Sequence, residues 1–243
     1  MSWRLARAVL ITDPLAILVF LLFAVTDWVG HRARLDPARR YRYGQFWSRL
    51  LLRVAGVRVE VSGASHLRPD GIYVLVANHR SLSDTPLLIG HLPVPFRFLA
   101  KQSLFRVPVI GGHLRRGGHI AVVRGDARSS RKALAESERV LAEASVLVFA
   151  EGTRGHGRLQ SFKSGAAHLA IRGGAPLVPV AISGSAEVLP RGSVHLRAGR
   201  VRIAIGEPIA TAGLRLQDED RLTARLQEQV TALLGDPVPA PGD

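Results

Sequence analysis

Short apolar runs and amphipathic segments alternate along most of this 243-residue chain. The short runs are rich in β-branched side chains, which is typical of buried strands, and the longer segments repeat with the period of a helix. Strands alternating with helices predict an α/β fold with a mixed, largely parallel sheet flanked by helices. We expect strands at Val57–Ser62, Ile72–Ala77, Phe96–Leu99, His119–Val123, Val146–Ala150, Leu177–Ile182 and Val201–Ile205, and helices at Phe46–Ala55, Thr85–His91, Ser129–Ala144, Gly165–Arg172 and Gln217–Leu234.

The first 45 residues follow a different pattern. Arginines precede an apolar stretch that Thr12-Asp13-Pro14 interrupts once, and arginines interleaved with aromatic residues follow it. The uninterrupted part, Pro14–Val25, would form a helix only ~18 Å long, against a hydrocarbon core of ~30 Å. We therefore expect a re-entrant or interfacial helix at a membrane surface. A single tilted span, a cleaved signal peptide and an ordinary buried helix are the alternatives.

The pattern predicts three parts: a membrane-anchoring helical segment over residues 1–45, one α/β domain over 46–235 and a flexible tail over 236–243. The chain has no cysteine, which excludes disulfides, thiolate metal sites and a cysteine nucleophile. Its net charge is +14, and all but three of its cationic side chains are arginines. So basic a chain suits nucleic acid, anionic lipid or phosphorylated substrates, and charge alone does not choose among them.

A histidine and a carboxylate follow one predicted strand. The run Ile72–Ala77 is followed by Asn78 and then His79, and Asp84 lies five residues after His79. On a continuous helix they would be ~140° apart, so they meet only if the chain turns between them, for example where Ser81 or Ser83 caps a helix. Asp84 would then bond one ring nitrogen of His79 and leave the other as a general base. This spacing alone is also common in solvated surface loops.

Other predicted strands also end in polar signatures. Arg124 follows His119–Val123, and Glu151-Gly152-Thr153-Arg154 follows Val146–Ala150. If the strands are parallel, their carboxyl ends gather at one edge of the sheet, where α/β folds place their chemistry. The remaining histidines lack metal-ligand spacing, and we expect no metal site.

In this order and spacing, the polar blocks resemble the glycerolipid acyltransferase family, with the 1-acylglycerol-3-phosphate (lysophosphatidate) acyltransferases as the closest branch. The resemblance covers roughly residues 45–210. Ala150 replaces the usual proline of one block and Ala121 a usually bulkier residue of another; neither removes a reacting group. The matching blocks are Asn78–Asp84 (NHxxxxD), Gly118–Arg124, Phe149–Arg154 (similar to FPEGTR), Phe162–Gly165 (FKxG) and Val178–Ile182.

The resemblance implies transfer of a fatty acyl group from acyl-CoA or an acyl carrier protein to the sn-2 hydroxyl of lysophosphatidate, with no cofactor. It implies that His79 is the general base and that Asp84 orients it. The lack of cysteine and of a GxSxG elbow favours direct attack over a covalent acyl-enzyme. Residues expected to bind the phosphorylated acceptor are Lys101, Arg124, Glu151, Gly152, Thr153 and Arg154; those expected in acyl-donor or structural roles are Asn78, Lys163 and Pro179.

The resemblance also implies partners and a location. We expect an anionic membrane surface, a lysophospholipid and an acyl thioester as partners, no nucleic acid, and membrane association at the cytoplasmic face of the inner (plasma) membrane. Two alternatives stay open. One is an acyltransferase for another lysolipid, such as a lyso-ornithine lipid or a lysophospholipid. The other is a non-catalytic basic protein that binds membranes or nucleic acid, which explains the charge but not the order of polar residues at strand ends.

Overall fold

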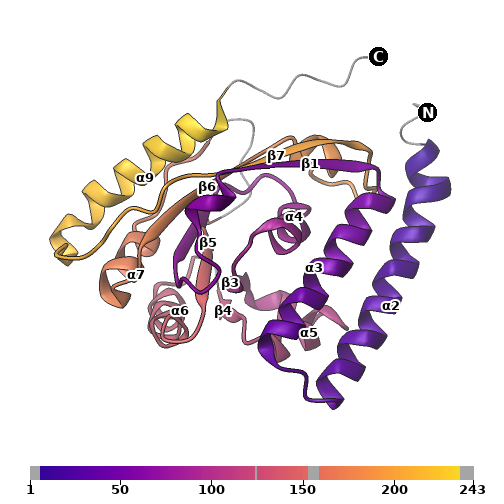
Figure 1. Cartoon of the computed structure of the whole chain (residues 1–243), viewed down its shortest axis with the longest axis horizontal. Coiled ribbons are helices and arrows are strands. Elements are labelled where there is room, and N and C mark those ends of the chain that lie inside the picture. The colour runs from indigo at the N-terminus through magenta and orange to yellow at the C-terminus, as the bar shows by residue number, and fades with distance from the viewer. Residues whose placement is uncertain (1–5, 124, 153–158, 236–243) are drawn as a thin grey trace.

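The computed structural model describes residues 6–123, 125–152 and 159–235, and in this part of the chain seven strands form one sheet in the order β1-β7-β6-β2-β5-β3-β4 (Figure 1). The strands are β1 (Val57–Ser62), β2 (Val74–Ala77), β3 (Phe96–Lys101), β4 (Ile120–Val122), β5 (Ser145–Phe149), β6 (Leu177–Ser183) and β7 (Gly199–Ile205). The α-helices are α2 (Asp13–Arg32), α3 (Pro37–Val54), α4 (Asp84–His91), α5 (Ile110–Arg116), α6 (Ala127–Val140), α7 (Gly165–Gly173), α8 (Ser185–Val188) and α9 (Glu219–Leu234).

The mixed, largely parallel sheet is confirmed. Neighbouring strands are parallel everywhere except between β6 and β7. This one antiparallel pair reverses the direction of β7 and β1 relative to β2. The amino-terminal end of β1 therefore lies at the same edge of the sheet as the carboxyl-terminal ends of β2 and β5.

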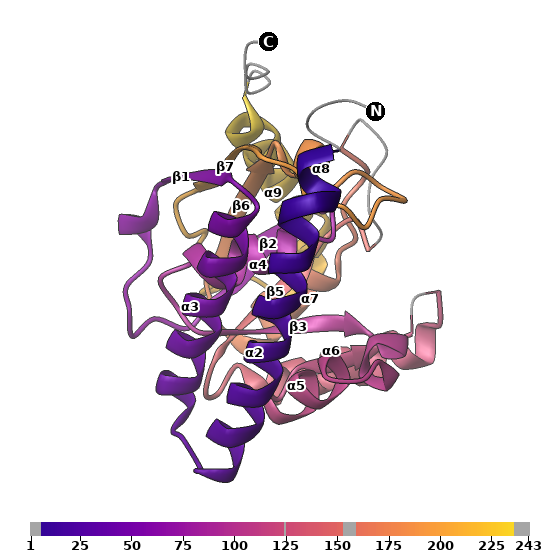
Figure 2. The same ribbon diagram turned by 90° about the vertical axis from the view of Figure 1, so that its right-hand side faces the viewer.

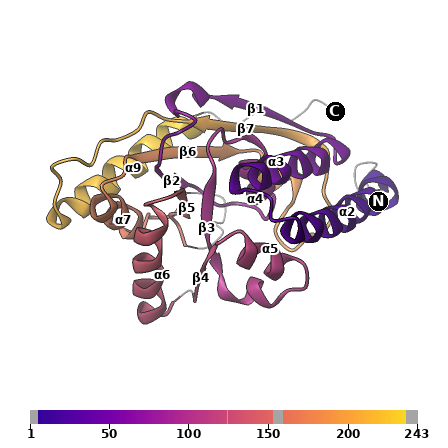
Figure 3. The same ribbon diagram turned by 60° about the horizontal axis from the view of Figure 1, so that its bottom comes forward.

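Helices cover both faces of the sheet (Figure 3). Helices α6, α7 and α9 pack on one face over a core that includes Leu169, Leu177 and Leu226. Helices α3 and α4 pack on the other, over a core that includes Leu87 and Leu147. Burial of these apolar side chains is the main force that holds the layers together.

Helix α3 begins earlier than the pattern predicts. The Asp36 side chain accepts a bond from Arg39 N at 2.9 Å, and Pro37 occupies the first helical position, two features that start a helix. The predicted start at Phe46 is wrong because the segment before it is too polar to show a helical period. The expected domain boundary at residue 45 lies inside this helix.

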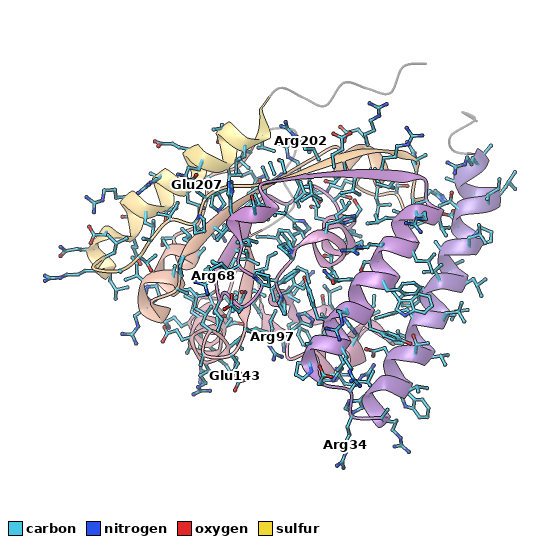
Figure 4. All side chains as sticks on the ribbon, in the orientation of Figure 1. Arg34, Arg68, Arg97, Glu143, Arg202 and Glu207 are labelled. Carbon is cyan, nitrogen blue, oxygen red and sulfur yellow. The ribbon has the colours of Figure 1, made fainter. Side chains whose placement is uncertain are left out.

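The predicted interruption at Thr12-Asp13-Pro14 is wrong as well. A π-helical turn, Ala8–Thr12, continues directly into α2, so Pro14 lies inside one continuous helix, just after a wider turn in which Asp13 N–H bonds Ala8 O. The resulting helix, Ala8–Arg32, has 25 residues and is long and apolar enough to cross a membrane by length and composition. Side chains project from its outer side, and Arg34 (φ 52°) lies in the turn to α3 (Figure 4).

Helix α2 lies beside α3 (Figures 1 and 2) and is fastened to the rest of the molecule near both ends. Near its start, Asp13 Oδ2 lies 2.6 Å from Nδ1 of His195. Near its end, Asp27 bonds Arg116 and lies 3.0 Å from Nδ1 of His113. These acids sit on the inner side of an otherwise apolar helix, so α2 is held along its length.

Candidate active site

The structure brings the predicted histidine and aspartate together. His79 lies two residues after the end of β2, and its Nδ1 lies 2.7 Å from Oδ2 of Asp84, the first residue of α4. His79 is 6% exposed and Asp84 is completely buried. The contact fixes the orientation of the ring and turns Nε2 away from the carboxylate.

The loop between the two residues wraps around the carboxylate. Oδ2 of Asp84 also accepts bonds from the backbone N–H groups of Arg80 and Ser81, at 2.8 and 2.9 Å. Ser83 occupies the N-cap position of α4, as expected, but its side chain makes no capping bond to the first turn of this helix. Asp84 therefore stabilises the fold of the loop through these backbone bonds and also contacts His79.

Ser81 and Ser83 instead tie the loop to the chain after β6. Oγ of Ser81 donates to Leu189 O at 2.8 Å and accepts a bond from Ser83 N. Oγ of Ser83 lies 2.9 Å from Oγ of Ser81 and 3.2 Å from Ser185 O. Both hydroxyls are thus engaged in holding the loop.

Glu151 bridges two loops. It is buried; its Oε1 accepts a bond from His79 N at 2.9 Å, and its Oε2 accepts one from Gln160 N at 3.0 Å. The sequence predicts that Glu151 binds the phosphorylated acceptor, and it does not predict these two backbone bonds. They tie the β5 loop to the backbone of the histidine.

The face of the imidazole rests on an aromatic ring. Phe149, the last residue of β5, stacks on His79 with ring centroids 4.0 Å apart and an interplanar angle of 16°. Phe98 stacks behind Phe149 at 6.2 Å. The sequence does not predict this stacking. The only sign of it in the sequence is an aromatic residue, Phe149, at the end of another predicted strand.

Asn78 locks β2 to β6. Its Nδ2 donates to Ile182 O at 2.9 Å and its Oδ1 accepts from Ile182 N at 2.8 Å, so the side-chain amide bonds both backbone groups of one residue, as a further strand residue would. Pro179 is buried in β6, opposite Val76 of β2, and its carbonyl accepts a bond from Gly206 N. These contacts are structural for both residues.

The residues expected to bind phosphate are only partly described. Arg124, Thr153 and Arg154 lie outside the described residues. Lys101 ends β3 and is exposed, opposite Val122 at the end of β4. The structure therefore places one of these cations at the carboxyl edge of the sheet.

Gly152 has two reasons to be glycine. Its φ is +69°, a conformation that side chains disfavour, and a Cβ on it would lie 3.1 Å from Nζ of Lys163. The exposed lysine thus lies directly over the turn that follows β5. A cavity of about 160 Å³ opens there, lined by both residues and by Leu134 and Val148.

Among the described residues, no group of three or more histidine and acidic side chains could hold a metal ion. The carboxylates near histidines in this part of the chain form pairs instead. One such pair, His168 Nδ1 and Glu219 Oε2, lies 3.1 Å apart between α7 and α9.

Comparisons with known proteins agree with this geometry. A family model described as Acyltransferase matches residues 58–183. A 1-acyl-sn-glycerol-3-phosphate acyltransferase of Chlamydomonas reinhardtii is 39% identical over 152 residues, which cover 61% of this chain and 46% of the relative. A chloroplastic 1-acyl-sn-glycerol-3-phosphate acyltransferase of Arabidopsis thaliana is 34% identical over 190 residues, covering 74% and 53%. The chain thus spans about half the length of these relatives.

A solved structure is also similar. The crystal structure of the 1-acyl-sn-glycerophosphate acyltransferase PlsC from Thermotoga maritima superimposes with a TM-score of 0.70 and 26% identity, covering 91% of this chain and 95% of that one. The family model spans more than half of the chain and includes the whole His79–Asp84 loop. On this match the chain belongs to the acyltransferase family.

Proposed function

We propose that this chain transfers a fatty acyl group from an acyl thioester to the sn-2 hydroxyl of lysophosphatidate, giving phosphatidate. The observation that carries the proposal is the buried contact between His79 and Asp84, held by backbone donors at the edge of the sheet. The names of the relatives support the acceptor, since each is a 1-acyl-sn-glycerol-3-phosphate acyltransferase.

His79 acts as the general base. Its Nε2 takes the proton of the acceptor hydroxyl while the hydroxyl oxygen attacks the thioester carbonyl. The tetrahedral intermediate then expels the thiolate, which recovers a proton from the imidazolium, so that an ester and a free thiol are formed. Asp84 stabilises the imidazolium and keeps the ring oriented.

The acyl group passes directly between the substrates. The chain has no cysteine, and the serine hydroxyls of the catalytic loop, Ser81 and Ser83, are engaged with each other and with backbone carbonyls. Neither is placed as a nucleophile activated by His79. These contacts support attack by the acceptor itself.

The phosphate of the acceptor binds to cations that follow predicted strands in the sequence, of which Lys101 lies at the carboxyl edge of the sheet. We assign this role to Arg154, Arg124 and Lys101, with Gly152 and Thr153 giving close backbone approach and Lys163 lying over the turn. Glu151 is a positioning residue, because its oxygens hold the backbone of His79 and the β5 loop. Arginine suits a phosphate because its guanidinium donates two parallel bonds.

The enzyme works at a membrane surface, on its cytoplasmic face, with acyl-CoA or an acyl carrier protein as donor. Helix α2 lies in the interface and does not span the bilayer. A span would carry Asp13, Asp27 and their domain partners, ~21 Å apart along the helix, into hydrocarbon. The outer side of α2 exposes Leu18, Leu21, Val25 and Trp28, which suits burial among acyl chains.

The experiment is an acyl-transfer assay with a panel of lysolipids and both donor types, on the wild type and His79→Ala. We expect lysophosphatidate to be the preferred acceptor and the substitution to lower turnover by ~10²–10⁴-fold. A matched control is His168→Ala, which removes a half-buried histidine between α7 and α9.

Each other outcome has a definite meaning. Preference for a lyso-ornithine lipid or another lysophospholipid would replace the acceptor and keep the chemistry. Near wild-type turnover of folded His79→Ala would overturn the role of the base. No transfer to any lysolipid, together with salt-dependent nucleic-acid binding, would favour a non-catalytic basic protein.

A further inference from the structure

A second cationic cavity lies apart from the His79–Asp84 pair, where α3 meets β1. It has a volume of about 620 Å³ and no acidic residue lines it. We call it the arginine pocket. Its polar lining consists of Arg7, Arg49, Arg53, Arg58 and His91.

The positive charge of the arginine pocket is not balanced by ion pairs. Among the described residues, none of its four arginines pairs with a carboxylate. Four guanidinium groups around one cavity repel one another, and an anion between them would relieve this repulsion. Exposed arginines elsewhere, such as Arg139 and Arg221, do have acidic neighbours.

One guanidinium group of the arginine pocket is held by the backbone, and a second lies close to it. Nε of Arg49 donates to Gly90 O at 2.5 Å. Arg7 lies against Gly56, whose φ is +74° and where a Cβ would come within 3.0 Å of Nη1. A glycine at this turn thus makes room for Arg7. Donors fixed in this way lose little freedom when a ligand binds.

The arginine pocket opens at the same edge of the sheet as the catalytic pair. Val57, which begins β1 and lines the pocket, pairs with Gly199 of β7, and the antiparallel β6–β7 pair brings this end level with the end of β2. Helix α4 links the two sites, since Asp84 begins it and His91 ends it. Its rise puts them roughly 10–12 Å apart along the helix.

We propose that the arginine pocket binds a phosphate group. Arginine recognises phosphate through paired, charge-assisted bonds, and a pocket with several such donors and no acid fits this chemistry. The phosphate has two available sources: the headgroup of an anionic lipid beside the exposed face of α2, or the nucleotide phosphates of coenzyme A, whose thioester lies at the end of a long flexible arm. The coenzyme A source rests on the proposed function, whereas the lipid headgroup source does not.

The test compares two double variants of the full-length protein. Arg53→Gln/Arg58→Gln removes two exposed arginines of the pocket, and Arg139→Gln/Arg225→Gln removes the same charge from α6 and α9. Binding of free coenzyme A is measured by calorimetry. Binding to phosphatidylcholine vesicles with and without phosphatidylglycerol is measured by sedimentation.

We expect the pocket variant to weaken binding in one arm by about tenfold or more relative to the control variant, with an unchanged melting temperature. Loss of coenzyme A binding would identify the nucleotide phosphates as the ligand. Loss of the phosphatidylglycerol-dependent part of vesicle binding would identify the lipid headgroup. Equal behaviour of the two double variants in both arms would overturn the proposal, because net charge alone would then explain the binding.

Discussion

The His79–Asp84 loop and helix α2 differ in how far the rest of the folded chain bonds or covers their side chains. In the loop, the carboxylate, both serine hydroxyls and the Asn78 amide bond to neighbouring parts of the chain. In α2, the inner side is fastened by two acids while the outer side leaves a row of apolar side chains exposed. Apart from Oδ1 of Asp84, these polar groups of the loop are bonded within the folded chain, whereas the described residues leave the outer side of α2 uncovered.

The largest expected effect comes from removing the charge at the centre of the loop. Asp84→Asn keeps an oxygen to accept the Arg80 and Ser81 N–H groups, and its amide can occupy the place of Oδ1, which has no hydrogen-bond partner. The fold should survive, but the imidazolium of His79 loses its counter-charge. We expect kcat to fall by ~10²–10⁴-fold in the acyl-transfer assay.

The matched control for this change is Asp36→Asn at the exposed cap of α3, where asparagine caps as well as aspartate. Turnover of Asp84→Asn within a few-fold of the wild type would show that the charge of this residue is not needed.

The next largest effect is expected on membrane binding, from changes on the exposed outer side of α2. Leu18→Asp/Val25→Asp places two charges on its exposed outer side, where each side chain is more than half exposed. Since nothing in the folded chain covers them, the melting temperature should not change. Binding to vesicles should fall by at least tenfold, because each buried leucine or valine contributes ~1.5–3 kcal/mol to transfer.

Leu216→Asp is the control for vesicle binding, because Leu216 is also exposed but lies before α9. If the double variant binds vesicles as tightly as this control, the outer side of α2 does not enter the membrane.

A smaller effect is expected at the contact that joins α2 to α5. Asp27→Asn leaves Arg116 and His113 without their anion at a contact where the Asp27 side chain is 9% exposed. We expect the free energy of unfolding to fall by about 1–3 kcal/mol, measured by denaturant titration, with α2 becoming the first site of limited proteolysis. In Asp70→Asn, which breaks an exposed pair with Arg68, no measurable change is expected. Equal stability of the two variants would contradict the role of Asp27.

The smallest effect concerns pH. Burial, with the charges of His113 and Arg97, lowers the pKa of His119 to about 3, and its Nδ1 accepts a bond from Phe98 N that a protonated ring cannot accept. The unfolded chain has a histidine pKa near 6.5, so between about pH 3 and 6.5 it binds more protons than the folded chain. The stability due to the neutral ring is therefore complete above about pH 6.5 and is lost as the pH falls toward 3.

Unfolding free energies at pH 7 and 5.5 measure this contribution. We expect a loss of about 1 kcal/mol at the lower pH for the wild type, and a smaller loss for His119→Gln, whose amide oxygen can still accept the Phe98 bond. The same loss in both proteins would assign the pH dependence to other groups.

The sequence predicts the reacting pair because both residues follow one apolar run and belong to a block, Asn78–Asp84, that resembles the NHxxxxD block of the glycerolipid acyltransferases. Their spacing alone would not distinguish this block from a surface loop. It does not predict what supports the pair. The stacking of Phe149 on His79 and the bonds of Glu151 depend on β5 lying next to β2. The hydrophobic pattern predicts strands but not their order in the sheet. The expected break at Thr12-Asp13-Pro14 is absent for another reason: proline usually ends or kinks a helix, and here a π-helical turn lies directly before it, a local irregularity that periodicity does not predict.

The amide of Asn78 has a consequence for how precisely the enzyme is built. By imitating a peptide group, it adds one rung to the sheet beyond the last true pairing of β2 with β6. The imidazole stands on the very next residue, so the height at which the base meets its substrate is set by the alignment of these two strands. A shift of either strand would move the reacting nitrogen of His79 away from the hydroxyl whose proton it accepts. The hydrogen bonds between Asn78 and Ile182 therefore help to set the geometry of the reaction.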